Sequence, residues 1–141
     1  MPSKIPKSES EFKKKLSPQQ YKILREKSTE LPFTGKLLHN KETGFYHCAA
    51  CGNKLFSSET KFDSGTGWPS FFDSIKNSVD LKEDGSLFMK RIEVQCKKCK
   101  SHLGHVFNDG PNPTGKRYCM NSLALNFKRK NSNLTKNQNL K

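Results

Sequence analysis

The alternation of apolar and polar positions divides the chain into a short helical region and a longer region of strands. Within the first 30 residues, Tyr21 and Leu24 recur at helical spacing. Ser17 is followed by proline and, three positions on, by glutamine, which is a capping-box pattern with proline at the first helical position. A weaker capping pattern begins at Ser8. We therefore expect a helix at about 18–27 that packs across the main body.

From residue 34 onward the apolar runs become short, and turn-forming Gly, Asn, Asp and Ser separate them. No long helical periodicity continues in this region. We expect strands at 45–47, 87–94, 105–107, 117–120 and 123–127, with turns at 40–44, 84–85 and 109–111. The sequence thus predicts a mainly β protein of antiparallel strands with short helices at its N-terminal end.

The length of 141 residues suits one ordinary domain, and 32% of the residues are hydrophobic. A core this modest benefits from an additional cross-link. Residues 130–141 are rich in Asn and Lys and nearly free of apolar groups, so we expect a disordered basic tail. We accordingly divide the chain into an N-terminal arm at 1–16, a folded domain at 17–129 and this tail.

The net charge is +13, from 26 Lys and Arg against 13 Asp and Glu. Residues 1–30 contribute +4 and residues 128–141 contribute +5, so most of the excess lies outside the expected β region. We interpret it as solvated termini and do not expect nucleic acid as a partner. No apolar run approaches the ~18 residues of a membrane span, and the first residues lack the apolar core of a secretory signal. We expect a cytoplasmic monomer without a membrane partner.

Four of the five cysteines form two Cys-x-x-Cys pairs, Cys48 with Cys51 and Cys96 with Cys99. Each such turn directs two sulfurs at one point, and two pairs together supply the four thiolates of a tetrahedral zinc site. The 44 residues between the pairs exceed the spacing of a compact zinc ribbon. We therefore expect one Zn²⁺ per chain, which cross-links distant parts of one sheet.

Other assignments of these cysteines stay open at the level of sequence. Two disulfides suit a secreted protein, and an iron–sulfur cluster or a redox-active pair uses the same spacing. His102 can replace one cysteine as a ligand, because Cys96, Cys99 and His102 are evenly spaced. A fully ligated four-sulfur site has no open coordination position, so we do not expect catalysis at the metal.

The fifth cysteine, Cys119, lies in a predicted strand between Arg117 and Asn121, which point to the same face. A guanidinium beside a thiol favours the thiolate and lowers its pKa from about 8.5, while the amide offers two donors. His102 and His105 titrate near neutrality and can act as acids or bases. Structural roles, as a small buried cysteine and as hydrogen-bonded histidines, stay open for these residues.

Three stretches together resemble the signature of the B-type methionine sulfoxide reductases: residues 61–71 (KFDSGTGWPSF), 101–107 (SHLGHVF) and 117–122 (RYCMNS). The resemblance extends over about residues 17–127. It implies a fold of two antiparallel β-sheets with short N-terminal helices, and a zinc site at the two cysteine pairs. It also implies reduction of the R epimer of methionine sulfoxide in proteins and peptides, with recycling by thioredoxin.

The chemistry of such a reaction fits the residues. A site that selects one epimer presents an apolar wall to the sulfoxide methyl and donors to its oxygen. We expect Trp68 and Phe107 to form the wall, and the two histidines and Asn121 to supply the donors. The Cys119 thiolate attacks the sulfur, a histidine protonates the oxygen, and Cys119 becomes a sulfenic acid. Many family members have a resolving cysteine where this chain has Thr66, so we expect thioredoxin or a small thiol to reduce Cys119 directly.

Two readings from other functional classes compete with this enzyme. The basic charge and the aromatic residues also suit a zinc-ribbon-like nucleic-acid-binding module, and the cysteine pairs also suit a zinc-stapled protein–protein adaptor. Neither function needs a reactive thiol, whereas the reductase is inactive without Cys119.

Overall fold

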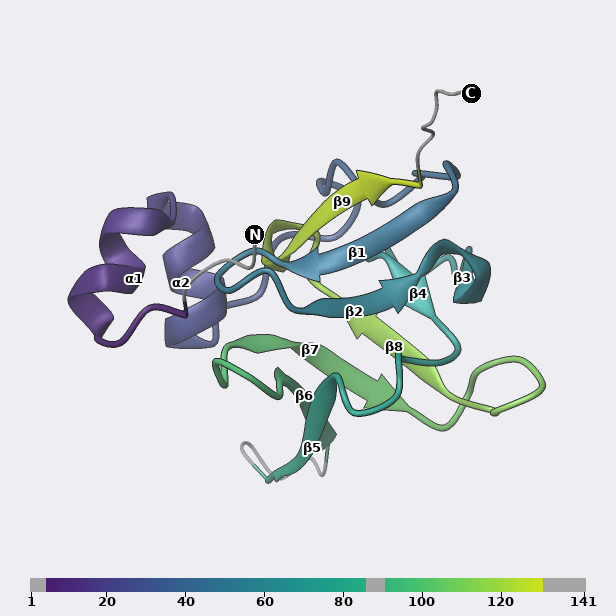
Figure 1. Cartoon of the computed structure of the whole chain (residues 1–141). Helices are drawn as coiled ribbons and strands as arrows, with labels where there is room; N and C mark the ends of the chain where they lie inside the picture. Colours follow the sequence, from purple (N-terminus) through teal and green to yellow (C-terminus); the bar gives the residue numbers. More distant parts are fainter. Residues whose placement is uncertain (1–4, 86–90, 131–141) are drawn as a thin grey trace.

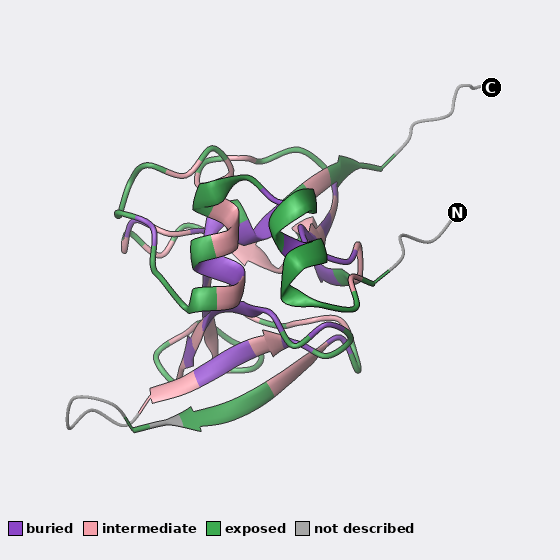
Figure 2. Cartoon of the chain, turned by 90° about the vertical axis from the view of Figure 1, so that its left-hand side faces the viewer, coloured by how far each residue is buried: buried purple, intermediate pink, exposed green. Residues whose placement is uncertain are grey.

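The computed structural model describes residues 5–85 and 91–130 (Figure 1). Its N-terminal part forms two helices, α1 (Glu9–Lys15) and α2 (Pro18–Glu26), which pack on each other beside the sheets. Figure 2 shows α1 almost entirely exposed, whereas α2 has buried and intermediate residues between exposed ones. Among the described residues, no helix has the length and apolarity needed to cross a membrane.

The capping pattern at Ser17 is confirmed. The Ser17 hydroxyl accepts a hydrogen bond from the Gln20 backbone N–H, and the Gln20 side chain accepts one from the Ser17 backbone N–H. At Ser8 half of the pattern forms, because the Glu11 carboxylate accepts from the Lys7 backbone N–H instead. The predicted helix and its starting residue are therefore correct.

Two antiparallel sheets make up the rest of the described chain, which confirms the predicted fold class (Figure 1). The smaller has the order β2-β1-β9 and the larger has the order β3-β4-β8-β7-β6-β5. The strands are β1 (Gly44–Cys48), β2 (Lys54–Ser57), β3 (Lys61–Phe62), β4 (Ser70–Phe71), β5 (Val79–Asp84), β6 (Arg91–Cys96), β7 (His102–Phe107), β8 (Arg117–Met120) and β9 (Leu125–Arg129).

Several details differ from the sequence prediction. The strand expected at 87–94 is β6, which continues to Cys96, and residues 87–90 lie outside the described residues. Strands β2, β3, β4 and β5 were not predicted. In β5 charged residues interrupt the apolar pattern, but β5 is an edge strand, where charged side chains are common. The expected strand at 123–127 begins later, at Leu125, because residues 122–124 form the short 3₁₀ helix η3. Most of the predicted basic tail also lies outside the described residues.

The core lies between the two sheets and contains stacked aromatic rings. Phe56 of β2 stacks on Phe71 of β4 with ring centroids 4.3 Å apart, and Tyr46 of β1 meets Phe71 edge-on at 5.0 Å. All three side chains are fully buried. Because these rings come from both sheets, their packing fixes how the small sheet lies on the large one.

Candidate metal centre and active site

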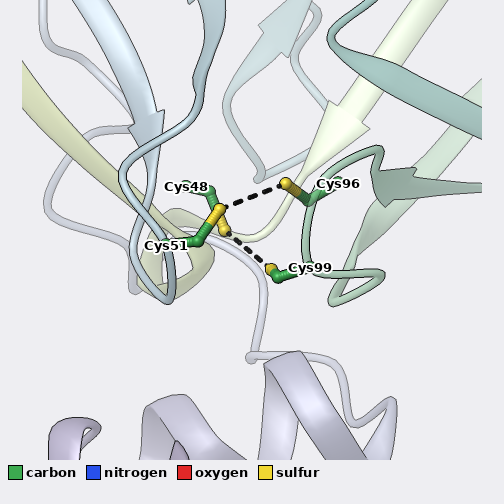
Figure 3. Close-up of side chains that lie close together, drawn as sticks. All are labelled: Cys48, Cys51, Cys96 and Cys99. Atoms are coloured by element: carbon green, nitrogen blue, oxygen red, sulfur yellow. Dashed lines mark hydrogen bonds between the residues drawn. The ribbon is translucent and has the colours of Figure 1, made fainter. Parts of the chain in front are cut away.

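The four paired cysteines converge where the ends of β1 and β6 meet (Figure 3). Their sulfurs lie within 4.8 Å of one another, with Cys48 Sγ 3.7 Å from Cys99 Sγ and Cys51 Sγ 3.5 Å from Cys96 Sγ. A tetrahedral ion about 2.3 Å from each sulfur requires sulfur–sulfur distances of about 3.8 Å. A disulfide requires about 2.05 Å, so the cysteines are free thiols and the disulfide assignment is wrong. The four residues can hold one metal ion.

Both cysteine turns are closed by backbone hydrogen bonds. Gly52 N–H donates to the Cys48 carbonyl, and Lys100 N–H donates to the Cys96 carbonyl, each at 2.8 Å. Gly52 has φ 83° and Lys100 has φ 64°, so each turn ends in the left-handed region. Hydrogen bonds from Cys48 and Cys51 hold the pKa of Cys96 well below its usual range. The same two cysteines also lower the pKa of Cys99, so the thiolate form is favoured at two of the four corners, which suits a cation.

Residues outside the cluster fix it from two sides. Arg25 of α2 donates through Nη1 to the Cys99 carbonyl at 2.9 Å and to Ser101 Oγ at 3.1 Å. Asn53 Nδ2 approaches Cys96 Sγ at 3.6 Å. His102 is not part of the four-sulfur set, and its Nδ1 is engaged by Glu93. The assignment of His102 as a metal ligand is therefore wrong.

Cys119 lines a separate cavity of about 260 Å³. Ligand pockets commonly measure ~300–1,000 Å³, so this volume suits one side chain rather than a large molecule. The lining residues are Thr29, Thr66, Trp68, Arg91, Gly104, His105, Phe107, Arg117, Cys119 and Asn121. A larger hollow, of about 770 Å³, lies beside Lys61 and Asp63, and no cysteine lines it. The smaller cavity is therefore the one that carries thiol chemistry.

Strand pairing sets the position of Cys119. In β8 it lies opposite Ser70 of β4 on one side and His105 of β7 on the other. Directly paired residues have their Cβ atoms about 4.5–5.5 Å apart, so the thiol and the imidazole share one face. A Cβ at Gly104 would lie 2.1 Å from the Cys119 carbonyl oxygen, so this close approach of β7 and β8 requires glycine.

The half-buried Cys119 thiol lies beside a chain of hydroxyl groups. Thr66 Oγ1 lies 3.9 Å from Cys119 Sγ and 2.8 Å from Ser64 Oγ, which in turn lies 2.7 Å from Ser70 Oγ. Burial raises the pKa of Cys119, whereas the Thr66 hydrogen bond and the charge of Arg117 lower it, and burial prevails. The expected fall in this pKa is therefore wrong in sign: Arg117 favours the thiolate but does not outweigh burial.

Arg117 shares its charge with a carboxylate, which explains its limited effect. Its Nε and Nη2 donate to the two carboxylate oxygens of Asp109 at 2.9 and 3.1 Å. Its guanidinium also lies over the Phe107 ring, 4.4 Å from the centroid. Phe107 and Arg117 thus form one wall of the cavity, apolar at the ring and cationic behind it.

The two histidines lie on the same face of β7 because that strand contains a bulge. Residues three apart on a regular strand point to opposite faces. The pairing of β7 with β6 shifts between Val94 and Gln95, and the His102 and His105 rings lie 5.4 Å apart, edge to face. His105 lines the cavity, whereas His102 is buried behind it with 3% exposure. His102 therefore contacts the site through His105.

A buried carboxylate fixes the tautomer of His102. Glu93 Oε2 lies 2.7 Å from His102 Nδ1, and the exposed Lys27 approaches Glu93 Oε1 at 3.5 Å. Burial raises the pKa of Glu93, but the hydrogen bonds from His102 and Gln95 and the charge of Lys27 together outweigh it, and the net direction is downward. Burial lowers the pKa of His102, so the ring is neutral near pH 7 with its proton on Nδ1. His102 Nε2 is a buried acceptor without a hydrogen-bond partner among the described residues.

Trp68 and Asn121 are held in place by the backbone of Glu30. Trp68 Nε1 donates to the Glu30 carbonyl, and Glu30 N–H donates to Asn121 Oδ1, both at 3.0 Å. Asn121 Nδ2 donates to the Leu103 carbonyl at 3.1 Å. Both ends of the Asn121 amide are thus bonded to backbone groups, and its buried side chain lines the cavity.

Comparison with known proteins agrees with this geometry. Residues 16–129 match the family model described as the SelR domain. A relative from Methanosarcina barkeri, named peptide methionine sulfoxide reductase MsrB, is 66% identical over 125 residues, 88% of each chain. One of the same name from Methanosarcina mazei is 64% identical over 126 residues, 89% of this chain and 90% of the relative. The chain belongs to the B-type methionine sulfoxide reductase family. The mitochondrial methionine-R-sulfoxide reductase B2 of Rattus norvegicus is 52% identical over 134 residues, covering 89% of this chain and 77% of that relative.

Family membership confirms the resemblance drawn from the sequence. In this B-type reductase six of the seven proposed active-site residues line one cavity: Trp68, His105, Phe107, Arg117, Cys119 and Asn121. The seventh, His102, lies behind it. Sequence reasoning missed Glu30 and Glu93, which are buried acidic residues held by hydrogen bonds. Nothing in the local pattern distinguishes them from surface carboxylates, since the partners of Glu30 lie more than 90 residues away and Glu93 meets His102 only through the pairing of β6 with β7.

Proposed function

We propose that this B-type reductase converts the R epimer of methionine sulfoxide in peptides and proteins to methionine, with Cys119 as the nucleophile. The observation that carries the proposal is the Cys119 thiol in a side-chain-sized cavity, paired across the strands with His105 and bounded by Trp68. The name of the rat relative supports the choice of the R epimer. The reductase domain then comprises residues 17–129.

The reaction transfers one oxygen from sulfoxide sulfur to cysteine sulfur. The sulfoxide methyl lies against Trp68 and Phe107, and the oxygen points toward His105. The Cys119 thiolate attacks the sulfoxide sulfur and forms a sulfur–sulfur bond, while His105 donates a proton to the oxygen. The hydroxyl then passes from the methionine sulfur to the Cys119 sulfur as the sulfur–sulfur bond breaks. Methionine leaves, and Cys119 is a sulfenic acid: one sulfoxide is reduced and one thiol is oxidised.

His105 is the proton donor in this scheme, and His102 and Glu93 position it. Glu93 fixes the proton of His102 on Nδ1, which leaves Nε2 as an acceptor on the side of the ring away from Glu93. The His102 ring packs edge to face on the His105 ring, with centroids 5.4 Å apart, and this contact restricts how the His105 ring turns. Asn121 holds the edge of the cavity in place, because it joins the backbone of Glu30 to that of Leu103 in β7.

The oxidised Cys119 is reduced by an external thiol. Thr66 lies next to the Cys119 sulfur, and the other four cysteines are gathered in the metal cluster. One thiol attacks the sulfenic acid, releases water and forms a mixed disulfide with Cys119. A second thiol then attacks this mixed disulfide and releases the Cys119 thiol. Thioredoxin or a small thiol supplies these two equivalents. Five free cysteines fit a reducing compartment, so we place the enzyme, as a monomer, in the cytoplasm.

The four-cysteine cluster holds one structural Zn²⁺ in this proposal. Its dimensions suit a single ion with four sulfur ligands and leave no open coordination position. The cluster joins the end of β1 in the small sheet to the end of β6 in the large sheet, so the expectation that it links two parts of one sheet is wrong. The ion therefore supplements a modest core and takes no part in the reaction.

One turnover without a reductant tests the mechanism. The reduced protein, mixed with excess blocked methionine R-sulfoxide and dimedone, should form one methionine per chain and carry dimedone on Cys119. The Cys119→Ser variant should form none. In the matched Thr66→Cys variant, the new thiol beside Cys119 should give an internal disulfide and no dimedone adduct. A disulfide in the natural chain between Cys119 and a cluster cysteine, with release of metal, would contradict the separation of the two sites.

A further inference from the structure

Two large apolar side chains in residues 29–35 are exposed to solvent. Leu31 is 73% exposed and Phe33 is 66% exposed, the two highest values among the large hydrophobic residues described. We call Leu31 and Phe33 together the apolar rim. Single exposed apolar residues are common, but two that are close in sequence at the edge of a cavity indicate a binding surface.

The backbone holds Phe33 outward at a conformational cost. Phe33 has φ 66°, in the left-handed region that aromatic residues avoid. Its N–H donates to the Gly67 carbonyl at 2.7 Å, and Thr34 Oγ1 donates to the Leu31 carbonyl at 2.6 Å. These two bonds keep a strained turn in place, and strain of this kind concentrates at functional sites.

The apolar rim is continuous with the cavity that contains Cys119. A Cβ at Gly67 would lie 3.1 Å from the Phe33 ring, so the ring packs directly over the Gly67 backbone. Gly67 lies between Thr66 and Trp68, and both of these residues line the cavity. Thr29 lines it too, two residues before Leu31. A peptide whose oxidised side chain enters the cavity therefore passes next to the rim.

We propose that the apolar rim binds apolar residues that flank methionine sulfoxide in an unfolded peptide segment. This inference rests on the proposed reductase function and adds its substrate class. Methionine is most often buried, and its oxidation to the polar sulfoxide disrupts core packing. Chain segments that leave the core after this oxidation carry other apolar residues close to the oxidised methionine in sequence. An extended chain advances about 3.3 Å per residue, so a residue one or two positions away reaches the Phe33 ring.

Substrates that differ in their flanking residues test the rim. The measurement is kcat/KM with dithiothreitol for three R-sulfoxides: a blocked single residue, a blocked pentapeptide with leucine flanks and the same pentapeptide with serine flanks. The variants are Phe33→Asn, whose asparagine tolerates the left-handed conformation, and Leu31→Asn. Leu81→Asn is the matched control, since Leu81 is 51% exposed on the edge strand β5, outside the cavity.

We expect the natural protein to prefer leucine flanks over serine flanks by about tenfold, as burial of one large apolar side chain suggests. Phe33→Asn and Leu31→Asn should abolish most of this preference while leaving the blocked single residue unaffected, and Leu81→Asn should change nothing. Equal losses on all three substrates would assign the rim to support of the cavity and overturn the proposal. A dimer that becomes monomeric on Phe33→Asn would make the rim a self-association surface and also overturn it.

The outcome separates this inference from the function on which it rests. If the natural protein reduces the blocked single residue but treats both pentapeptides alike, the rim is not a substrate site and the reductase function stands. If it reduces none of the three, the reductase function itself is wrong.

Discussion

Replacement of Glu30 should weaken both the fold and the active site. The Glu30 side chain is buried, and its two carboxylate oxygens accept from the backbone N–H groups of Ser122 (2.8 Å) and Leu123 (3.0 Å), at the start of η3. Each hydrogen bond to a charged group contributes about 1.5–3 kcal/mol. Glu30→Gln keeps one acceptor and points an amide N–H at the other donor, so it should cost about 1.5–3 kcal/mol. Glu30→Ala leaves two buried donors without partners and should cost about 3–5 kcal/mol.

Urea unfolding and hydrogen exchange measure this effect at constant metal content. With a slope of about 2 kcal/mol per molar urea, Glu30→Gln should lower the midpoint by roughly 1 M. The control is Glu42→Gln, because Glu42 pairs with Arg129 on the surface and should cost less than about 1 kcal/mol. Looser positioning of Trp68 should also slow sulfoxide reduction by about tenfold in Glu30→Gln. Equal midpoints for the two variants, with unchanged amide protection at Ser122 and Leu123, would refute the assignment.

Two further predictions concern the cluster and the reactive thiol. Metal analysis should find about one zinc per chain, and Cys96→Ser should lower both zinc content and melting temperature. Structural zinc contributes on the order of 10–16 kcal/mol of binding free energy, against a usual net stability of about 5–15 kcal/mol. Metal-free protein that melts at an unchanged temperature would exclude a structural role. Because burial raises the pKa of Cys119, its alkylation by iodoacetamide, followed by mass spectrometry, should still accelerate above the ordinary thiol pKa. Arg117→Gln removes a positive charge that lowers this pKa, so the pH profile of alkylation should move to higher pH. Asp109→Asn removes a negative charge that raises this pKa, so the same profile should move to lower pH. Shifts of both variants in the same direction would refute the electrostatic account.

Features fixed by local spacing were predictable from the sequence. Each Cys-x-x-Cys pair forms its own hydrogen-bonded turn. The four-cysteine cluster could therefore be predicted on the assumption that the two turns meet in the fold. The two-residue period of a strand placed Arg117 and Cys119 on one face of the cavity. The capping pattern at Ser17 gave the start of α2, because both of its hydrogen bonds span three residues.

Features set by distant contacts or by burial were not predictable in this way. The bulge that turns His102 toward His105 is a property of the pairing between β6 and β7. Glu30 binds residues more than 90 positions away in sequence. The pKa of Cys119 depends on how deeply the folded chain buries the thiol, and the sequence showed Arg117 but not that burial.

The stereochemistry of turnover tests the central claim most directly. The natural protein and Cys119→Ser are incubated with dithiothreitol and separately with the R and S epimers of a blocked methionine sulfoxide, and methionine formation is measured by chromatography. The account predicts that the natural protein reduces the R epimer, leaves the S epimer essentially untouched, and loses all activity in Cys119→Ser. Equal reduction of both epimers, or undiminished turnover by Cys119→Ser, would contradict it.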